Sequence, residues 1–240
     1  MKAGSKAGVT LMELLIAISL VSLLFVGILM ALRVGMNAMD KANARLMSNR
    51  RVIGAGRALE QQIAGMIVTM ADCRSGPGAG PVKRPFFEGR PQSMRFVSSY
   101  SLAEASRGYP RILEYQVIPG ENNEGVRLVV NELLYTGPAS TGRLCLGPDP
   151  GGAGTLFRPI EIGPQSFVLA DKLAFCRFLY QEPAPPPRRK VWVPVWTRPE
   201  FPLAIRVEMA PLAADAAQLP LVSFTAPVRV NKNPAFAYVD

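Results

Sequence analysis

The sequence predicts an α+β protein in which a long N-terminal helix packs on an antiparallel β-sheet. Three observations support this fold class. Residues 14–32 form an uncharged apolar run, residues 33–72 repeat apolar side chains at helical spacing, and the rest alternates short apolar runs with turns. A chain of 240 residues with 49% apolar side chains suits one globular domain of ordinary size plus an appendage.

The apolar run predicts a transmembrane helix over residues 9–32. The uncharged run itself, residues 14–32, has nineteen residues. As a helix these residues span about 28 Å, close to the roughly 30 Å of a bilayer core. A soluble helix of this length normally keeps one polar face. Lys2 and Lys6 precede the run and favour a cytoplasmic N-terminus, whereas Arg33 and Lys41 beyond it favour the opposite orientation more weakly.

Glu13 is the one acid at the start of this apolar run. A carboxylate within a bilayer costs about 2.5–3.5 kcal/mol at the centre and less near the interface. One interpretation is an interfacial acid at headgroup level. The other is an acid that awaits a cation: if the chain is cut after Gly8, the new ammonium of Val9 lies four residues from Glu13, on the same helical face. That amine could belong to the same chain or to a neighbour.

The arrangement of Gly8, Val9, Glu13 and a long apolar helix resembles the class III signal of type IV pilins and pseudopilins. The resemblance implies that residues 1–8 are a leader, which a prepilin peptidase removes by cutting between Gly8 and Val9 and methylating Val9. It also implies that Glu13 pairs with the N-terminal amine of an adjacent subunit during filament assembly. Val9 departs from the family, which usually shows phenylalanine there.

Beyond the apolar run, residues 33–72 predict an amphipathic stem helix that ends near Asp72, before the breaker sequence RSGPGAGP. Residues 73–240 are expected to form a β-rich head, beginning with a surface loop over residues 73–92. LEYQVI and AIRVEM alternate apolar with polar residues, as half-buried antiparallel strands do. The expected strands are residues 94–98, 112–118, 126–135, 173–180, 191–195, 203–209 and 222–230.

The head resembles the J-type minor pseudopilin of type II secretion. Three stretches carry this resemblance: Leu173, Phe175, Arg177 and Tyr180; Trp192 and Trp196; and Phe201-Pro202-Leu203-Ala204-Ile205-Arg206-Val207. It implies the pseudopilin fold, a single-pass inner-membrane protein with a periplasmic head, and a role near the filament tip in protein export. The implied partners are I- and K-type minor pseudopilins, the major pseudopilin, prepilin peptidase and membrane lipid. The proline-rich insert 183–187 and the glycine-rich loop 147–154 depart from that pattern.

Two alternatives to this function remain open. A minor type IV pilin of the W-like kind, which primes pilus assembly, shares the same N-terminal signal. A membrane-tethered periplasmic binding module would use the helix only as an anchor, and a tethered hydrolase is a further variant of that idea. A tether should tolerate the replacement of Glu13 by alanine, whereas a filament subunit should lose assembly while it keeps membrane insertion.

Composition argues against an enzyme. The chain has no histidine, which excludes Ser-His-Asp triads, Cys-His dyads and HExxH zinc sites. We therefore expect no catalytic residue, no cofactor and no metal. Three cysteines allow at most one internal disulfide; we expect Cys73–Cys145 first, because both residues lie at loop boundaries, and the sequence leaves the other pairings open.

The chain carries a net charge of +9, but its basic residues are spread out, except for Arg188-Arg189-Lys190, so we expect no nucleic-acid partner. Trp192 and Trp196 follow this basic run. On a strand they would point to the same face, where packing in the core or a hairpin is the simpler interpretation and a partner-binding aromatic patch is the alternative.

Overall fold

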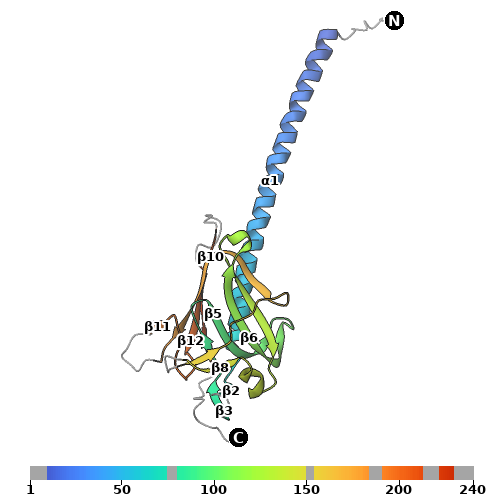
Figure 1. The fold of residues 1–240 in the computed structure, drawn as a ribbon. Helices are drawn as coiled ribbons and strands as arrows, with labels where there is room; N and C mark the ends of the chain where they lie inside the picture. Colours follow the sequence, from blue (N-terminus) through green and yellow to red (C-terminus); the bar gives the residue numbers. More distant parts are fainter. Residues whose placement is uncertain (1–9, 75–79, 150–153, 184–190, 213–221, 230–240) are drawn as a thin grey trace, which may run out of the picture. The chain divides into compact units, whose positions relative to one another are not determined.

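The computed structural model describes residues 10–74, 80–149, 154–183, 191–212 and 222–229. The chain divides into two compact units, Met1–Ser48 and Asn49–Asp240. One long helix, α1 (Leu11–Ala64), supplies the described part of the first unit, and its last turns belong to the second, β-rich unit (Figure 1). The expected α+β layout, a long apolar helix followed by a large antiparallel sheet, is present.

The strands and short helices follow α1 along the chain. They are β1 (Met66–Ile67), β2 (Met70–Arg74), β3 (Pro81–Pro85), β4 (Glu88–Gly89), β5 (Ser93–Ser101), β6 (Ser106–Pro119), η1 (Glu121–Asn123), β7 (Val126–Leu134), α2 (Pro138–Gly142), β8 (Cys145–Pro148), β9 (Thr155–Phe157), β10 (Phe167–Gln181), β11 (Trp192–Val193), β12 (Ala204–Pro211) and β13 (Val222–Pro227). The main sheet has the order β1-β5-β6-β7-β10-β12-β13, with β4 on β5 and β11 on β10.

β10 joins the two halves of the main sheet. Its first residues pair with β7 and its later residues pair with β12, both antiparallel. The register shifts between Ala170 and Leu173, where Lys172 adopts a positive φ of 52°. A bulge of this kind bends a strand and increases its twist. The backbone N–H of Phe178 then donates to the carbonyl of Pro91 at 2.9 Å, which ties the second half of β10 to the start of β5.

The last turns of α1 form the centre of the main core. Ala55, Leu59 and Ile63 recur at every fourth residue on one helical face, and all three are buried. They pack with inward-pointing side chains of the sheet, among them Phe96 of β5 and Phe178 of β10. Burying an aliphatic side chain of this size contributes about 1.5–3 kcal/mol, so this helical face holds the sheet and the end of α1 together.

The opposite face of the sheet is covered over β5 and β6 by a small substructure that we call the disulfide cap. It consists of β2, β3, α2, β8 and β9. A second core fills the space below it, with Val97 and Ile112 from the sheet packed against Phe86 and Phe157. Because both faces of β5 and β6 are buried here, these strands are interior strands and not the half-exposed strands that LEYQVI predicts.

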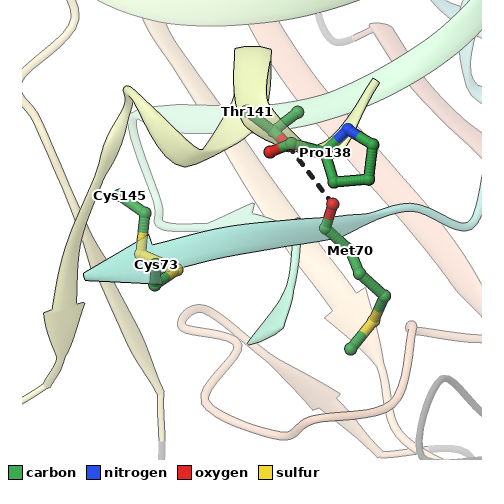
Figure 2. The surroundings of a disulfide bond; sticks show 5 residues. All are labelled: Met70, Cys73, Pro138, Thr141 and Cys145. Carbon is green, nitrogen blue, oxygen red and sulfur yellow. Dashed lines mark hydrogen bonds between the residues drawn. A yellow bond between two sulfur atoms is a disulfide. The ribbon is translucent and has the colours of Figure 1, made fainter. Parts of the chain in front are cut away.

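A disulfide between Cys73 and Cys145 joins β2 to β8 across the cap, with the Cα atoms 5.4 Å apart (Figure 2). This is the pair expected first from the sequence. Beside it, the hydroxyl of Thr141 in α2 donates to the carbonyl of Met70 at 3.3 Å. α2 lies so close to β2 that a Cβ atom on Gly142 would meet the backbone of Asp72, so glycine is required at this contact.

The stem helix ends earlier than the sequence predicts, at Ala64 and not near Asp72. The residues between form β1 and most of β2. At Gly65 the chain passes so close to β5 that a Cβ would lie 2.8 Å from the Ser98 hydroxyl, and the N–H of Ser99 donates to the Gly65 carbonyl at 2.9 Å. The segment after Gly65 therefore pairs with β5 as a strand and does not continue the helix. The β-branched residues that follow Gly65 also favour a strand.

The expected loop over residues 73–92 is wrong in part, because β3 and β4 lie within it and Phe86 is fully buried. The seven expected strands correspond to β5, β6, β7, β10, β11, β12 and β13, with shifted ends. Trp192 and Trp196 do not share a face. β11 ends at Val193, so Trp192 stays half-buried while Trp196 turns into the main core.

Removing the disulfide should destabilise the β-rich unit. The bond closes a loop with a sequence separation of 72 residues, and removing such a cross-link typically costs about 2–4 kcal/mol. We expect the double variant Cys73→Ala/Cys145→Ala to lose this amount in urea unfolding of the full chain in detergent. Cys176→Ala, which leaves the disulfide in place, is the control, and equal stability of the two variants would contradict a clamping role.

Alkaline pH should also weaken the fold, because three buried groups resist ionisation. Burial raises the pKa of the Cys176 thiol from 9.0 to about 12. Burial, followed by the charge of Glu132, raises the pKa of Tyr115, whose hydroxyl donates to Gln62. Burial, followed by the charge of Glu88, raises the pKa of Tyr180. Their stabilising contribution is complete below the unfolded pKa values, near pH 9 for the thiol and pH 10 for the phenols.

Above those values the unfolded chain ionises and the native chain does not, so stability falls as pH rises. Each such group removes about 1.4 kcal/mol per pH unit within its window. Urea midpoints measured from pH 8 to pH 11 should fall most steeply above pH 10. Cys176→Ala should flatten the part of the curve that begins near pH 9, and an unchanged curve would contradict the assignment to this thiol.

Candidate functional site

The N-terminal end of α1 is capped by Thr10. The backbone N–H of Glu13 donates to the Thr10 hydroxyl at 3.3 Å and to the Thr10 carbonyl at 3.0 Å. The N–H of Leu14 also donates to that carbonyl, at 3.2 Å. Thr10 is therefore the N-cap residue, whose side-chain oxygen accepts from a backbone N–H of the first turn, a position that lacks an i−4 partner.

Glu13 lies in the first turn of α1 and is exposed. Its position three residues after the N-cap is that of the acid in a capping box, and a carboxylate there also interacts favourably with the positive end of the helix dipole. The structure therefore adds a local role for Glu13 to the pairing role inferred from the sequence. Glutamine can take the capping role as well as glutamate, whereas pairing with an amine requires the negative charge of glutamate. Replacement by glutamine therefore distinguishes the two roles.

The helix that follows is apolar on every face. Its large apolar side chains between Leu11 and Leu32 are 49–80% exposed. The hydroxyl of Ser22 donates to the carbonyl of Ile18 at 2.8 Å, and that of Ser19 donates to the carbonyl of Leu15, so both hydroxyls are satisfied without water. α1 contains one segment, Leu11–Asn43, which is long and apolar enough to cross a membrane; its most apolar 18 residues have a mean hydropathy of 2.8.

The cleavage residues Gly8 and Val9 lie outside the described residues. The distance between the Val9 nitrogen and the Glu13 carboxylate therefore stays a sequence-based expectation. The structure does place Glu13 at the entrance to the apolar segment, with Thr10 before it and an exposed apolar surface after it.

The sequence did not predict a buried ionic cluster on β4, β5 and β6, beneath the disulfide cap. Arg95 of β5 is fully buried. Its Nε donates to Glu114 Oε1 at 2.8 Å, its Nη1 to Glu88 Oε2 at 2.6 Å, and its Nη2 to the Arg158 carbonyl at 2.9 Å. The guanidinium also lies over the Phe157 ring, with its Cζ 5.3 Å from the ring centroid. All three guanidinium nitrogens thus have acceptors, as a buried charge requires.

A signal for this cluster was present in the sequence. Arg95 interrupts the apolar run Met94, Phe96 and Val97, and Glu114 lies at the same register position on the neighbouring strand. Opposite charges at facing strand positions attract each other. The pattern could be recognised only once β5 and β6 were known to pair in this register.

Few groups in the described part of the chain are suited to covalent or metal chemistry. The Cys176 thiol is buried in β10, and its raised pKa keeps it protonated at neutral pH, whereas thiol nucleophiles act as thiolates. Among the described residues, no group of three or more cysteine, aspartate and glutamate side chains could hold a metal ion.

No protein-family model matches the chain, and no curated protein matches it either.

Proposed function

We propose that this chain is a minor pseudopilin of a type II secretion filament. A prepilin peptidase cuts the precursor between Gly8 and Val9 and methylates the Val9 amine. The mature subunit, held in the inner membrane with its head in the periplasm, then joins I- and K-type minor pseudopilins and the major pseudopilin near the filament tip. There it supports protein export without catalysing a reaction.

One observation carries this proposal: an acid stands in the first turn of a helix that is otherwise apolar on every face. In a bilayer, such a carboxylate costs free energy unless a cation neutralises it. The expected cut at Gly8 creates an ammonium four residues before Glu13, and subunits stacked with an axial offset bring that ammonium to the Glu13 of a neighbour. Assembly then replaces a poorly solvated acid with an ion pair.

The apolar helix supports the same proposal through packing. In lipid, the segment loses no hydrophobic stabilisation, because the acyl chains are as apolar as its side chains. Movement from lipid into a bundle of similar helices is therefore nearly neutral for the apolar side chains. The pairing of Glu13 is then the term that favours the filament, which makes a single charged residue decisive for assembly.

The β-rich unit supports a periplasmic location and the J-type assignment. Its Cys73–Cys145 disulfide is typical of an oxidising compartment. The J-type motif residues occupy β10, β11, the segment before β12 and β12 itself, which pair as neighbours in the sheet. The alternative with the same N-terminal signal is a minor type IV pilin of the W-like kind; recovery in sheared pilus fractions instead of complexes with minor pseudopilins would favour it.

The N-terminal mass of the protein isolated from its native membrane tests this function. We expect the mature chain to begin at Val9 and to carry one N-methyl group. A chain that retains Met1, or one that begins beyond residue 32, would contradict the proposal, because the amine would then never lie near Glu13. A mature chain that begins at an unmethylated Val9 would support the predicted cleavage and contradict only the predicted methylation.

A further inference from the structure

The outer face of the main sheet is covered unequally. The disulfide cap covers it over β5 and β6, where Val97 and Ile112 are buried. Over β10, β12 and β13, none of the described residues forms a comparable layer, and the outward side chains of Phe175 and Thr225 are exposed. We call this second area the open face and define it by Phe175, Arg177, Trp192, Arg206, Glu208 and Thr225.

The strand pattern explains why these side chains point outward. Cys176 and Phe178 point into the main core, so Phe175 and Arg177, their alternate neighbours on β10, point to the other face. Arg206 lies between buried Ile205 and Val207 on β12 for the same reason. The open face is therefore a regular sheet surface with fixed side-chain positions.

Two arginines on the open face are held against aromatic rings. The guanidinium carbon of Arg206 lies 4.1 Å from the centroid of the Trp192 ring, and that of Arg177 lies 5.7 Å from the centroid of the Phe175 ring. Such stacking restrains long side chains before any partner binds. Tryptophan and arginine are also the residue types most enriched at the energetic centres of protein interfaces.

The exposed charge of the open face is positive. Glu208 is the acid shared by both arginines: Arg177 Nη2 lies 2.6 Å from its Oε2, and Arg206 Nη1 lies 4.0 Å from its Oε1. The side chains of Arg177 and Arg206 are 57% and 34% exposed, against 13% for Glu208. One sheltered carboxylate thus faces two guanidinium groups that have further donors directed to solvent.

The positive charge continues beyond these two arginines. An open hollow of about 680 Å³ adjoins Phe175 and Arg177 and is also lined by Arg90. Arg90 pairs with Glu88 at 2.9 Å, and its side chain is 52% exposed against 12% for Glu88. The basic run Arg188-Arg189-Lys190 lies outside the described residues. A partner for this surface must therefore bring carboxylates.

We propose that the open face is a docking surface for a second protein that presents aspartate or glutamate side chains beside apolar ones. A second copy of this chain would place like charges against each other in a symmetric contact. A single-stranded nucleic acid would need free aromatic faces for its bases, but arginines already cover the Trp192 and Phe175 rings. A partner with separate carboxylates can approach the two arginines on either side of Glu208.

This inference goes beyond the proposed function and does not rest on it. The surface belongs to the β-rich unit, whereas the observation that carries the filament proposal is Glu13 at the start of the N-terminal helix. Only the J-type assignment within that proposal uses residues of this surface. A docking partner on the open face is compatible with a filament subunit and with a tethered binding module. The N-terminal mass tests only the filament proposal, and the crosslinking experiment described next tests only docking, so the two can fail independently.

The test uses the full-length chain in its native membrane, with a photo-crosslinking amino acid in place of Phe175. We expect a crosslink to a protein segment that carries aspartate or glutamate. The charge-reversed variant Arg177→Glu/Arg206→Glu should lose at least about tenfold in crosslink yield, and lysine at the partner's acidic positions should restore it. Arg107→Glu, the same charge change at an exposed arginine elsewhere on the sheet, should leave the yield unchanged.

Several results would overturn the proposal: crosslinks only to a second copy, to lipid or to nucleic acid, no crosslink at all, or a yield that does not respond to charge reversal. The melting temperature of each variant is measured in detergent to identify loss of folding. If the charge-reversed pair unfolds, Arg177→Gln/Arg206→Gln replaces it, because glutamine still offers Glu208 a hydrogen-bond donor. This neutral pair should likewise lower the yield about tenfold, and an unchanged yield would count against docking.

Discussion

Replacement of Arg95 by methionine should lower the free energy of unfolding by about 3–5 kcal/mol, the cost of leaving buried charges without their partner. The side chains of Glu88 and Glu114 are only 12% and 6% exposed, so neither carboxylate can recover its hydration in the native fold. Glu88 keeps a second ion pair with Arg90 at 2.9 Å, whereas Glu114 keeps a hydrogen bond from Asn131 at 3.3 Å, so most of the expected loss arises at Glu114. Methionine fills much of the vacated space, which makes the lost charge the main difference. Urea unfolding of the full chain in detergent measures the effect.

The matched control is Arg111→Met. Arg111 also pairs with a glutamate, Glu104, at 2.5 Å, but the two side chains are 24% and 40% exposed. A pair accessible to solvent is worth about 0–1 kcal/mol, so this variant should lose little stability. A second comparison is Arg95→Met combined with Glu114→Leu, which removes the less exposed of the two carboxylates and should recover part of the loss. Equal free energies of unfolding for Arg95→Met and Arg111→Met would contradict the prediction that the buried cluster stabilises the fold more than an exposed ion pair does.

Replacement of Glu13 by glutamine should abolish assembly while the chain still inserts into the membrane. In the proposed filament, an ion pair with the neighbour's Val9 amine would offset an acid that costs about 2.5–3.5 kcal/mol in mid-bilayer, so its loss should reduce the assembled fraction by at least about tenfold. The assembled fraction is measured by crosslinking and co-purification with other minor pseudopilins. Membrane flotation, which should not change, measures insertion.

Glutamine separates the two roles that the structure and the sequence assign to Glu13. Glutamine can still accept a hydrogen bond from the Thr10 N–H as the third residue of a capping box, whereas alanine loses both this acceptor and the charge. If Glu13→Gln and Glu13→Ala lose assembly equally, charge pairing is responsible. Thr10→Ala, which removes the capping hydroxyl seen at 3.3 Å, should cost about 1 kcal/mol in helix stability and spare assembly. Normal assembly of Glu13→Gln would instead favour a tether.

Patterns that depend on near neighbours in the chain predicted the elements well. The apolar run preceding Arg33 is part of a helix, and the alternation in residues 204–209 corresponds to β12. Helical and strand periods reflect which side chains lie on one face of a single element, and this information is contained within a few residues. The Glu13 position at the start of the apolar helix was likewise visible from local order alone.

The elements that were missed depend on contacts between distant parts of the chain. The stem helix ends at Ala64 because Gly65 approaches Ser98 of β5, a contact that no local window contains. Trp192 and Trp196 separate because the backbone N–H of Trp196 donates to the Gly89 carbonyl at 2.8 Å, which turns its side chain inward. Spacing within residues 191–196 could not distinguish the two environments.

Local patterns along the chain are enough to predict a long apolar helix with an acid at its entrance, followed by an antiparallel sheet. Which charges are buried and which faces are open depends on how distant segments pack together. Arg95 and Arg206 both interrupt apolar strand residues, yet one is fully buried with two glutamates and the other lies over Trp192 at the surface. The physical reason is that burial is set by what packs on a face from elsewhere in the chain, and the disulfide cap covers only the first of these two arginines.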